Sequence, residues 1–167
     1  MKIMKFGGTS VGRPDRMRQV KSLILSDSEK KIVVLSALSG TTNALVQIGE
    51  AMAKGDKELA KQYIDALEAH YFDFHDELLH TEEGKKEALG IIKEHFEFLN
   101  IILKISFNEA INRDILAQGE LLSTKLFYTL LKESGVKAVF LPALDFMSID
   151  ENQDPELLKI SEKLQSI

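Results

Sequence analysis

Two short apolar runs in this chain each end in small and hydroxyl-bearing residues, an arrangement that can hold phosphate. The first run covers residues 2–6, carries Lys5 near its end, and is followed by two glycines and two hydroxyl residues. The second covers residues 33–35 and leads into the small and hydroxyl-bearing stretch 36–43. Backbone N–H groups at two such strand-to-helix junctions, together with one ammonium group, would meet at one sheet edge and could stabilise bound phosphate.

Lys5 is the candidate catalytic residue. Because residues 2–6 form a near-continuous apolar run, they predict a buried parallel strand, and Lys5 then lies at the carboxyl edge where open α/β sheets bind ligands. An ammonium group there, beside the backbone donors of Gly7 and Gly8, can neutralise charge on a transferred phosphoryl group. A surface lysine before a tight turn is the simpler interpretation of a lone Lys-x-Gly-Gly. Neither a Walker A loop nor a Gly-x-Gly-x-x-Gly motif is present, so any nucleotide site has another design.

Two other segments carry candidate substrate-binding groups. The hydroxyls of residues 36–43 precede a predicted helix whose N-terminus has partial positive charge, although Thr41 or Thr42 could be only the N-cap of that helix. Glu120 is the one acid in an apolar and hydroxyl-bearing stretch; it could bind a substrate ammonium group, but a solvated glutamate is the simpler interpretation. Gly119 costs about 1 kcal/mol relative to alanine inside a helix, which indicates close approach of another segment.

Apolar periodicity predicts the elements that position these residues. The predicted strands cover residues 2–6, 32–35 and 136–141. The predicted helices cover about residues 14–26, 41–54, 57–78, 85–103, 109–134 and 154–166, of which the third and fourth form an antiparallel pair. A strand, a helix and a second strand within the first 35 residues make the right-handed crossover unit of α/β folds. We therefore expect an α/β fold with a small, mainly parallel sheet and a helical insertion.

Composition excludes several classes of function. With 44% hydrophobic residues the chain can build the core of one ordinary domain. A net charge of −5, without a basic stripe, argues against nucleic-acid binding. There is no cysteine for a disulfide or a thiolate metal site, and the spacing of five between His70, His75 and His80 does not align them on a helix face as metal ligands. Because no run suits a signal peptide or a bilayer span, we expect no membrane association and a cytoplasmic location.

Three blocks of the sequence together resemble one known family. Residues 5–11, Lys-Phe-Gly-Gly-Thr-Ser-Val, resemble the N-terminal signature of aspartate kinases and differ from that of uridylate, glutamate and acetylglutamate kinases. Residues 36–43 are similar to the second phosphate and substrate loop of the family, and residues 118–124 to its substrate-glutamate helix. The resemblance covers residues 2 to about 150. It implies a partial αβα sandwich of the amino-acid-kinase (carbamate-kinase-like) fold, with residues 1–167 as the N-terminal portion of the catalytic domain.

The resemblance implies ATP-dependent phosphorylation of the side-chain carboxylate of L-aspartate to 4-phospho-L-aspartate, the first step of lysine, threonine and methionine biosynthesis. Lys5 would stabilise charge on the γ-phosphoryl group. The residues at the nucleotide would be Lys5, Phe6, Gly7, Gly8 and Ser36. Mg²⁺ would be carried mainly by the ATP phosphates rather than by a protein metal site, and the full-length enzyme would be a homo-oligomer.

By the same resemblance, Thr42 and Glu120 would bind aspartate, Glu120 through the substrate ammonium group. This agrees with the chemistry inferred from the residues alone. A carboxylate nucleophile is already ionised at neutral pH, so it needs positioning and charge neutralisation rather than a general base.

The sequence also departs from the family pattern. The glycine-rich Arg-Gly-Gly-Ser-Asp segment, the adenine-binding strands and the regulatory ACT domains are not in these 167 residues, and residues 147–150 lack the arginine-bearing loop of some relatives. We therefore expect the chain alone not to turn over, because half of the electrostatic clamp is missing.

Two alternatives stay open. The chain could be a non-catalytic binding or interaction module whose exposed sheet edge is covered by a partner. It could also be a kinase of another small carboxylate or amino acid in the same fold. A reading frame that continues past Ile167 would favour the kinase over the module.

Overall fold

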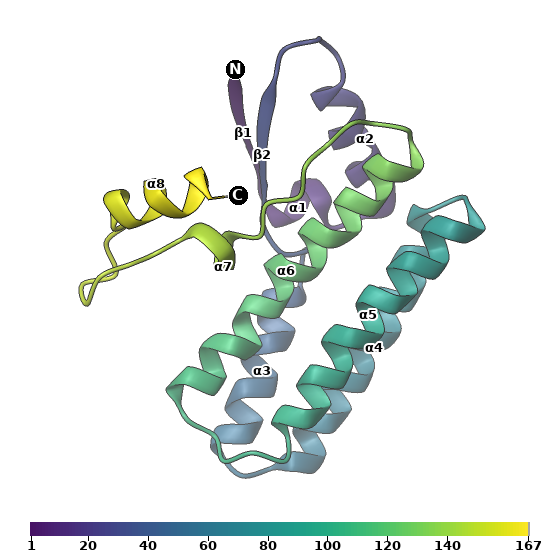
Figure 1. Ribbon diagram of the computed structural model, residues 1–167. Coiled ribbons are helices and arrows are strands. Elements are labelled where there is room, and N and C mark those ends of the chain that lie inside the picture. The colour runs from purple at the N-terminus through teal and green to yellow at the C-terminus, as the bar shows by residue number, and fades with distance from the viewer. Residues whose placement is uncertain (167) are drawn as a thin grey trace.

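The computed structural model describes residues 1–166 and has one small sheet beside a set of long helices (Figure 1). In chain order the elements are β1 (Lys2–Phe6), α1 (Gly8–Val11), α2 (Pro14–Ile24), β2 (Lys31–Leu35), α3 (Thr41–Ala53), α4 (Lys57–Leu78), α5 (Glu82–Ile102), α6 (Glu109–Glu133), α7 (Ala143–Phe146) and α8 (Leu157–Gln165). The sequence predicted each of these except the two short helices α1 and α7.

The strands β1 and β2 are parallel, with Phe6 opposite Leu35, and α2 joins them as the predicted crossover. Side chains alternate across this sheet, as the strand period of two requires. The residues on the packed face are Met4, Phe6, Val33 and Leu35. The residues on the opposite face are exposed and include Ile3, Ile32 and Val34. One face of the sheet is therefore built into the core and the other is open to solvent, so the strand at residues 2–6 is confirmed but its prediction as a buried strand is wrong.

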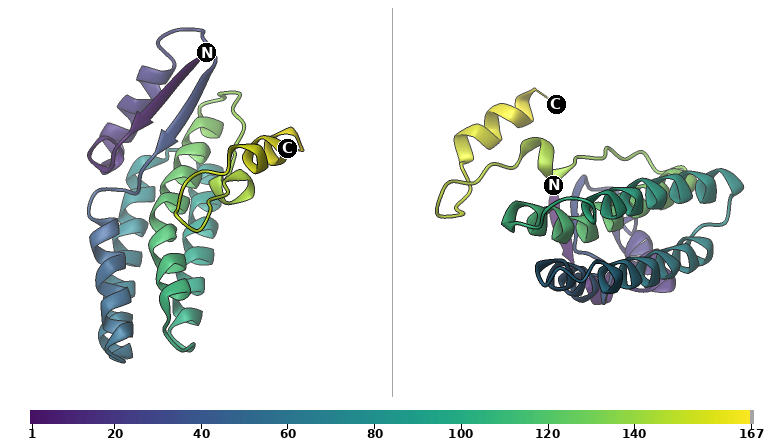
Figure 2. Two further views of the ribbon diagram at one scale, coloured as in Figure 1. Left: turned by 90° about the vertical axis from the view of Figure 1, so that its left-hand side faces the viewer. Right: turned by 90° about the horizontal axis from the view of Figure 1, so that it is seen from below.

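Helices α3 to α6 form a bundle in which each helix packs on two of the others (Figures 1 and 2). Their buried apolar stripes meet at residues such as Leu45, Tyr71, Ile92, Phe96 and Leu122. Burial of each such side chain contributes about 1.5–3 kcal/mol, which makes this bundle the main source of stability. The predicted antiparallel pair is confirmed as α4 and α5.

Side-chain caps fix where three of these helices begin. Asp56 accepts a hydrogen bond from the Leu59 N–H at 3.0 Å, and Asn108 accepts one from the Ile111 N–H at 3.0 Å. Both helix starts were predicted from the sequence. Thr81 caps α5 through the Gly84 N–H, so α5 begins earlier than the expected residue 85.

The predicted third strand at residues 136–141 is wrong. These residues form no strand, and they pair with no other strand in the described part of the chain. Val139 is 81% exposed, while the Phe140 ring stacks on Tyr128 of α6 with 5.6 Å between the ring centroids. A β-type sequence forms a strand only where a neighbouring strand supplies hydrogen bonds, which the local pattern cannot guarantee. The sheet of the described residues has two strands instead of the expected three.

After residue 141 the chain leaves the bundle as an arm that carries α7 and α8, visible at the side of the molecule in Figure 2. An isolated antiparallel bridge joins Ile149 to Pro155 within it. Several of its apolar side chains are strongly exposed, among them Leu144, Leu157 and Leu158.

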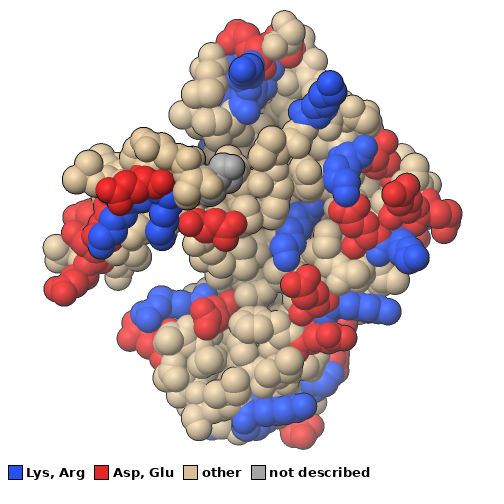
Figure 3. All heavy atoms as spheres, in the orientation of Figure 1, with Lys and Arg blue, Asp and Glu red and all other residues tan. Residues whose placement is uncertain are grey.

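On the face drawn in Figure 3, basic and acidic side chains are interspersed over the bundle and the arm. No helix among the described residues is both long and apolar enough to cross a membrane.

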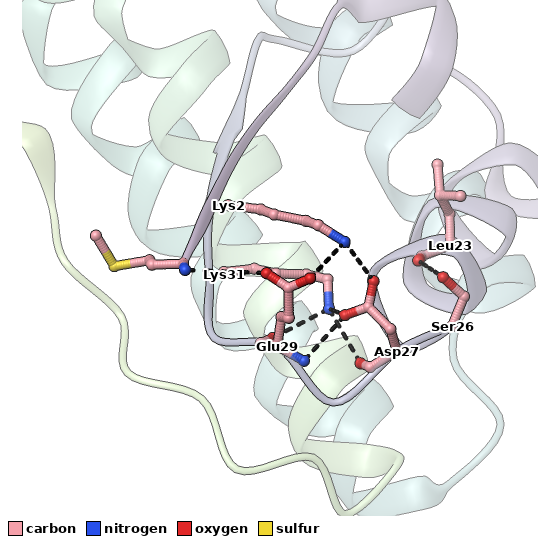
Figure 4. A network of polar contacts seen from close by, with 7 residues as sticks. Lys2, Leu23, Ser26, Asp27, Glu29 and Lys31 are labelled. Carbon is pink, nitrogen blue, oxygen red and sulfur yellow. Dashed lines mark hydrogen bonds and ion pairs between the residues drawn. The ribbon is translucent and has the colours of Figure 1, made fainter.

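Charged residues join the amino ends of the two strands (Figure 4). The Lys2 ammonium lies 2.8 Å from an Asp27 carboxylate oxygen and 2.9 Å from one of Glu29, and Lys31 also pairs with Asp27. The hydrogen bonds from Lys2 and Lys31 hold the pKa of Asp27 well below its usual range. The lysines at this edge of the sheet are therefore already neutralised by acids of the same chain.

Candidate phosphate and substrate site

The carboxyl ends of β1 and β2 lie side by side, and both predicted junctions meet there. The Ser36 N–H donates to the Phe6 carbonyl at 3.0 Å and so continues the strand pairing by one step. Gly8 begins α1 directly against the second junction, where an added Cβ would lie 2.9 Å from the Ala37 carbonyl oxygen. At Gly7 an added Cβ would meet no atom within 4 Å. Gly8 is thus required by chain packing, while Gly7 leaves open space beside backbone donors.

Helix α6 closes the site from the side. The Glu120 carboxylate accepts a hydrogen bond from the Ala37 N–H at 3.2 Å, and the Ser123 hydroxyl donates to the Ser36 carbonyl at 2.7 Å. An added Cβ at Gly119 would lie 2.7 Å from the Ala37 Cβ, so the predicted close approach of another segment is confirmed. These two hydrogen bonds and the close approach of Gly119 to Ala37 therefore hold Glu120 at the end of β2.

The first turn of α3 presents one buried and one exposed hydroxyl. The N-cap of α3 is Gly40, and both Thr41 and Thr42 lie inside the helix, so the interpretation of either threonine as a mere N-cap is wrong. Thr41 is buried and its hydroxyl lies 3.1 Å from the Tyr71 hydroxyl of α4. Thr42 is exposed. Of the two threonines, Thr42 is the one whose hydroxyl can reach a ligand.

Lys5 and Phe6 point to different faces because they are neighbours on a strand. Phe6 packs against the core, so it can offer a ligand only its backbone. Lys5 is exposed and, among the described residues, forms no ion pair, in contrast to Lys2 and Lys31 at the other edge of the sheet. The one strand lysine near the carboxyl edge is thus available to an external anion.

The sequence pattern did not predict that the Tyr71 hydroxyl takes part in this region as a polar group. The position of Tyr71 in the apolar stripe predicts core packing, and the residue is fully buried. Burial raises the pKa of the Tyr71 hydroxyl well above its ordinary value, and the negative charge of Glu120 raises it further. The only sequence signal was chemical: a buried tyrosine hydroxyl nearly always needs a hydrogen-bond partner.

The structure brings Gly8, Ser36, Glu120 and the start of α3 together around residues 36–41, and it places Lys5 on the adjoining strand. No group of three or more His, Asp or Glu side chains within residues 1–166 could hold a metal ion. At one sheet edge the arrangement offers an ammonium group, a hydroxyl, a carboxylate and the N–H groups of Gly7 and Gly8, which form no hydrogen bond among the described residues. It is suited to binding a phosphate donor and a small cationic or zwitterionic acceptor.

The fold is that of a phosphotransferase family. The sequence model of the amino acid kinase family matches residues 1–165. This chain belongs to the amino acid kinase family, and its α/β fold is that of the family.

Among its relatives are aspartokinases. The chain is 28% identical over 163 residues to the lysine-sensitive aspartokinase 3 of Escherichia coli, a match that covers 96% of this chain and 35% of that protein. It is 34% identical over 166 residues to the chloroplastic aspartokinase 2 of Arabidopsis thaliana, covering 94% of this chain and 29% of that protein. The chain thus spans about a third of the length of these relatives.

Solved structures agree with the sequence matches. The chain superposes on Escherichia coli aspartokinase III in complex with aspartate and ADP with a TM-score of 0.80 and 26% identity, over 99% of this chain and 37% of that one. It also superposes on the aspartate kinase of Clostridium acetobutylicum with a TM-score of 0.75, which at 18% identity shows the shared fold alone.

Proposed function

We propose that this chain carries the aspartate-binding part of an aspartate kinase, which transfers the γ-phosphoryl group of ATP to the side-chain carboxylate of L-aspartate and gives 4-phospho-L-aspartate. The observation that supports this most directly is the contact between Glu120 and the segment that follows β2. This contact holds a carboxylate against residues that directly precede α3, whose first turn carries the exposed hydroxyl of Thr42. That combination matches an acceptor with both an ammonium and carboxylate groups.

The roles of the substrate-binding residues follow from charge. Glu120 binds the α-ammonium group of aspartate, since it is the acid that α6 holds against the ends of the strands. Thr42 donates its hydroxyl to a substrate carboxylate. The side-chain carboxylate of aspartate has a pKa of about 3.9 and is already a nucleophile at neutral pH, so the site needs no general base.

The nucleotide side of the site fits MgATP. ATP supplies the phosphoryl group and leaves as ADP, and Mg²⁺ on its phosphates neutralises part of their charge. Lys5 stabilises the negative charge that the phosphoryl group and the two flanking oxygens share. The backbone N–H groups of Gly7 and Gly8 and the side-chain hydroxyl of Ser36 bind phosphate oxygens, and the open space at Gly7 permits their approach.

Titration calorimetry with L-aspartate and, separately, with MgATP tests this function. We expect the chain to bind L-aspartate, the Glu120→Gln variant to lose that binding, and the chain alone to form no aspartyl phosphate. Glu97→Gln is the matched control, because Glu97 is an exposed glutamate of α5 in the same bundle. A folded chain that does not bind aspartate, or that binds it equally well as Glu120→Gln, contradicts the proposal.

A non-catalytic interaction module is the second candidate, and the open face of the sheet favours it. Ile32 and Val34 are 45% and 44% exposed there, an unusual state for strand residues of this kind. Specific aspartate binding that depends on Glu120 would decide against a module without substrate, whereas its absence would favour one.

A further inference from the structure

The α4–α5 hairpin reaches the substrate site through two buried polar contacts. In residues 1–166, the hydrogen bonds between two buried side chains are those of Tyr71 with Thr41 and of His95 with Gln118. Thr41 is the first residue of α3, next to Thr42, and Gln118 lies two residues before Glu120 on α6. Both contacts therefore end within two positions, along the chain, of a proposed substrate-binding residue.

The His95 contact anchors α6. The His95 Nδ1 lies 2.6 Å from the Gln118 side-chain oxygen, and the Gln118 amide group donates to the Asp114 carbonyl at 2.9 Å. On the other side of the imidazole ring, the Lys125 ammonium lies 2.9 Å from Nε2. The turn of α6 that carries Glu120 is thus tied to α5 from within.

The Tyr71 contact fixes the other side of the site. Tyr71 is held rigidly, because it is fully buried and its ring packs on Phe96 with 5.8 Å between the centroids. Its hydroxyl lies 3.1 Å from the Thr41 hydroxyl. The Thr41 methyl group faces α6, where it would lie 3.2 Å from a Cβ added at Gly119. Tyr71 thus selects the side-chain rotamer that turns the hydroxyl of Thr41 toward α4 and its methyl toward α6.

We propose that Tyr71 is a positioning residue for aspartate binding: through Thr41 it holds the start of α3 against α6, so that Thr42 and Glu120 face one substrate. This inference rests on the proposed function. Without the Tyr71 hydroxyl, no hydrogen bond ties the first turn of α3 to the rigid Tyr71 side chain, and Thr41 can rotate. Threonine populates more than one rotamer in helices, so the rotation is accessible.

The inference is tested by L-aspartate calorimetry on the 167-residue chain and on its Tyr71→Phe variant. We expect Tyr71→Phe to weaken aspartate binding about tenfold, the equivalent of one buried hydrogen bond, with MgATP binding unchanged. Tyr63→Phe is the matched control: Tyr63 lies on the same helix and its hydroxyl bonds to no described side chain. An unchanged aspartate affinity in Tyr71→Phe overturns the inference, and it leaves the proposed function intact if Glu120→Gln still abolishes binding.

A double variant separates positioning from simple stabilisation. Tyr71→Phe alone leaves the Thr41 hydroxyl buried and unpaired, whereas Tyr71→Phe with Thr41→Val replaces both partners with apolar groups of similar shape. We expect the double variant to recover the melting temperature of the chain but not its aspartate affinity, because no hydrogen bond then orients the start of α3. If affinity returns together with the melting temperature, the role of Tyr71 is structural and the inference fails.

Discussion

Replacement of Gly119 by alanine tests whether α6 touches the segment after β2 as closely as the structure shows. The added methyl carbon would lie 2.7 Å from the Ala37 Cβ and 3.3 Å from a Leu45 methyl group, well inside the ordinary carbon contact distance of about 3.5–4.0 Å. Overpacking of this kind costs about 1–3 kcal/mol, and the better helix propensity of alanine returns about 1 kcal/mol. We therefore expect a net loss of about 0–2 kcal/mol and weaker aspartate binding.

Gly90 provides the matched control, because it lies exposed in the interior of α5 and an added Cβ there meets no atom within 4 Å. Gly90→Ala gains the helix propensity without the clash, so it should stabilise the chain by about 1 kcal/mol. Thermal unfolding of the two variants should then differ by about 2 kcal/mol, or about 4–8 °C in melting temperature. If Gly119→Ala is stabilised as much as Gly90→Ala, α6 does not approach residue 37 as described.

Two further predictions concern pH and a loop contact. Burial, with help from the nearby Lys125 ammonium, holds the pKa of His95 below its ordinary value of about 6.5. The unfolded chain then binds this proton more readily, so the contribution of His95 to stability is complete above about pH 6.5 and is lost as the pH falls toward the folded-state pKa. Urea unfolding of His95→Gln should show a shallower loss of stability between about pH 7 and 5; an unchanged slope contradicts the assignment. The Glu133 carboxylate accepts hydrogen bonds from the His80 N–H and from the N–H and hydroxyl of Thr81, all at 2.9 Å. Glu133→Gln should lower the free energy of unfolding at pH 7 by about 1 kcal/mol, and a variant as stable as the parent would show that the contact contributes nothing.

Local patterns in the sequence predicted the helices well because each helix carries its own signals. Asp56 caps α4 and Asn108 caps α6 through N–H groups only three positions away, and the apolar stripe of α4 repeats every three or four residues, so no distant contact is needed to recognise these signals. The third strand at residues 136–141 failed for the opposite reason, since a strand depends on a partner that can lie anywhere in the chain.

The same division applies to the candidate site. The poor helix propensity of Gly119 predicted a close contact with another segment, and the structure shows that the segment is the one that contains Ala37. The pattern could not show that Thr41 and Thr42 have different environments, because both follow Gly40 and differ only in the direction that the helix gives them. Tyr71 lies in the buried stripe of α4, where the apolar periodicity predicts burial of the ring but does not predict the hydrogen bond of its hydroxyl group.

The long-range contacts of Glu120 and Ser123 have a consequence for the order in which the chain folds. These two hydrogen bonds join residues that are 83 and 87 positions apart, whereas each helix cap acts over three positions. Closing a loop costs about 0.6 kcal/mol more for each doubling of its length, so we expect these contacts to form after the local ones. The α4–α5 hairpin is local, and once formed it shortens the effective loop between α3 and α6. We therefore expect the candidate site to assemble after the α4–α5 hairpin, so that its geometry depends on a segment that supplies none of the proposed substrate-binding residues.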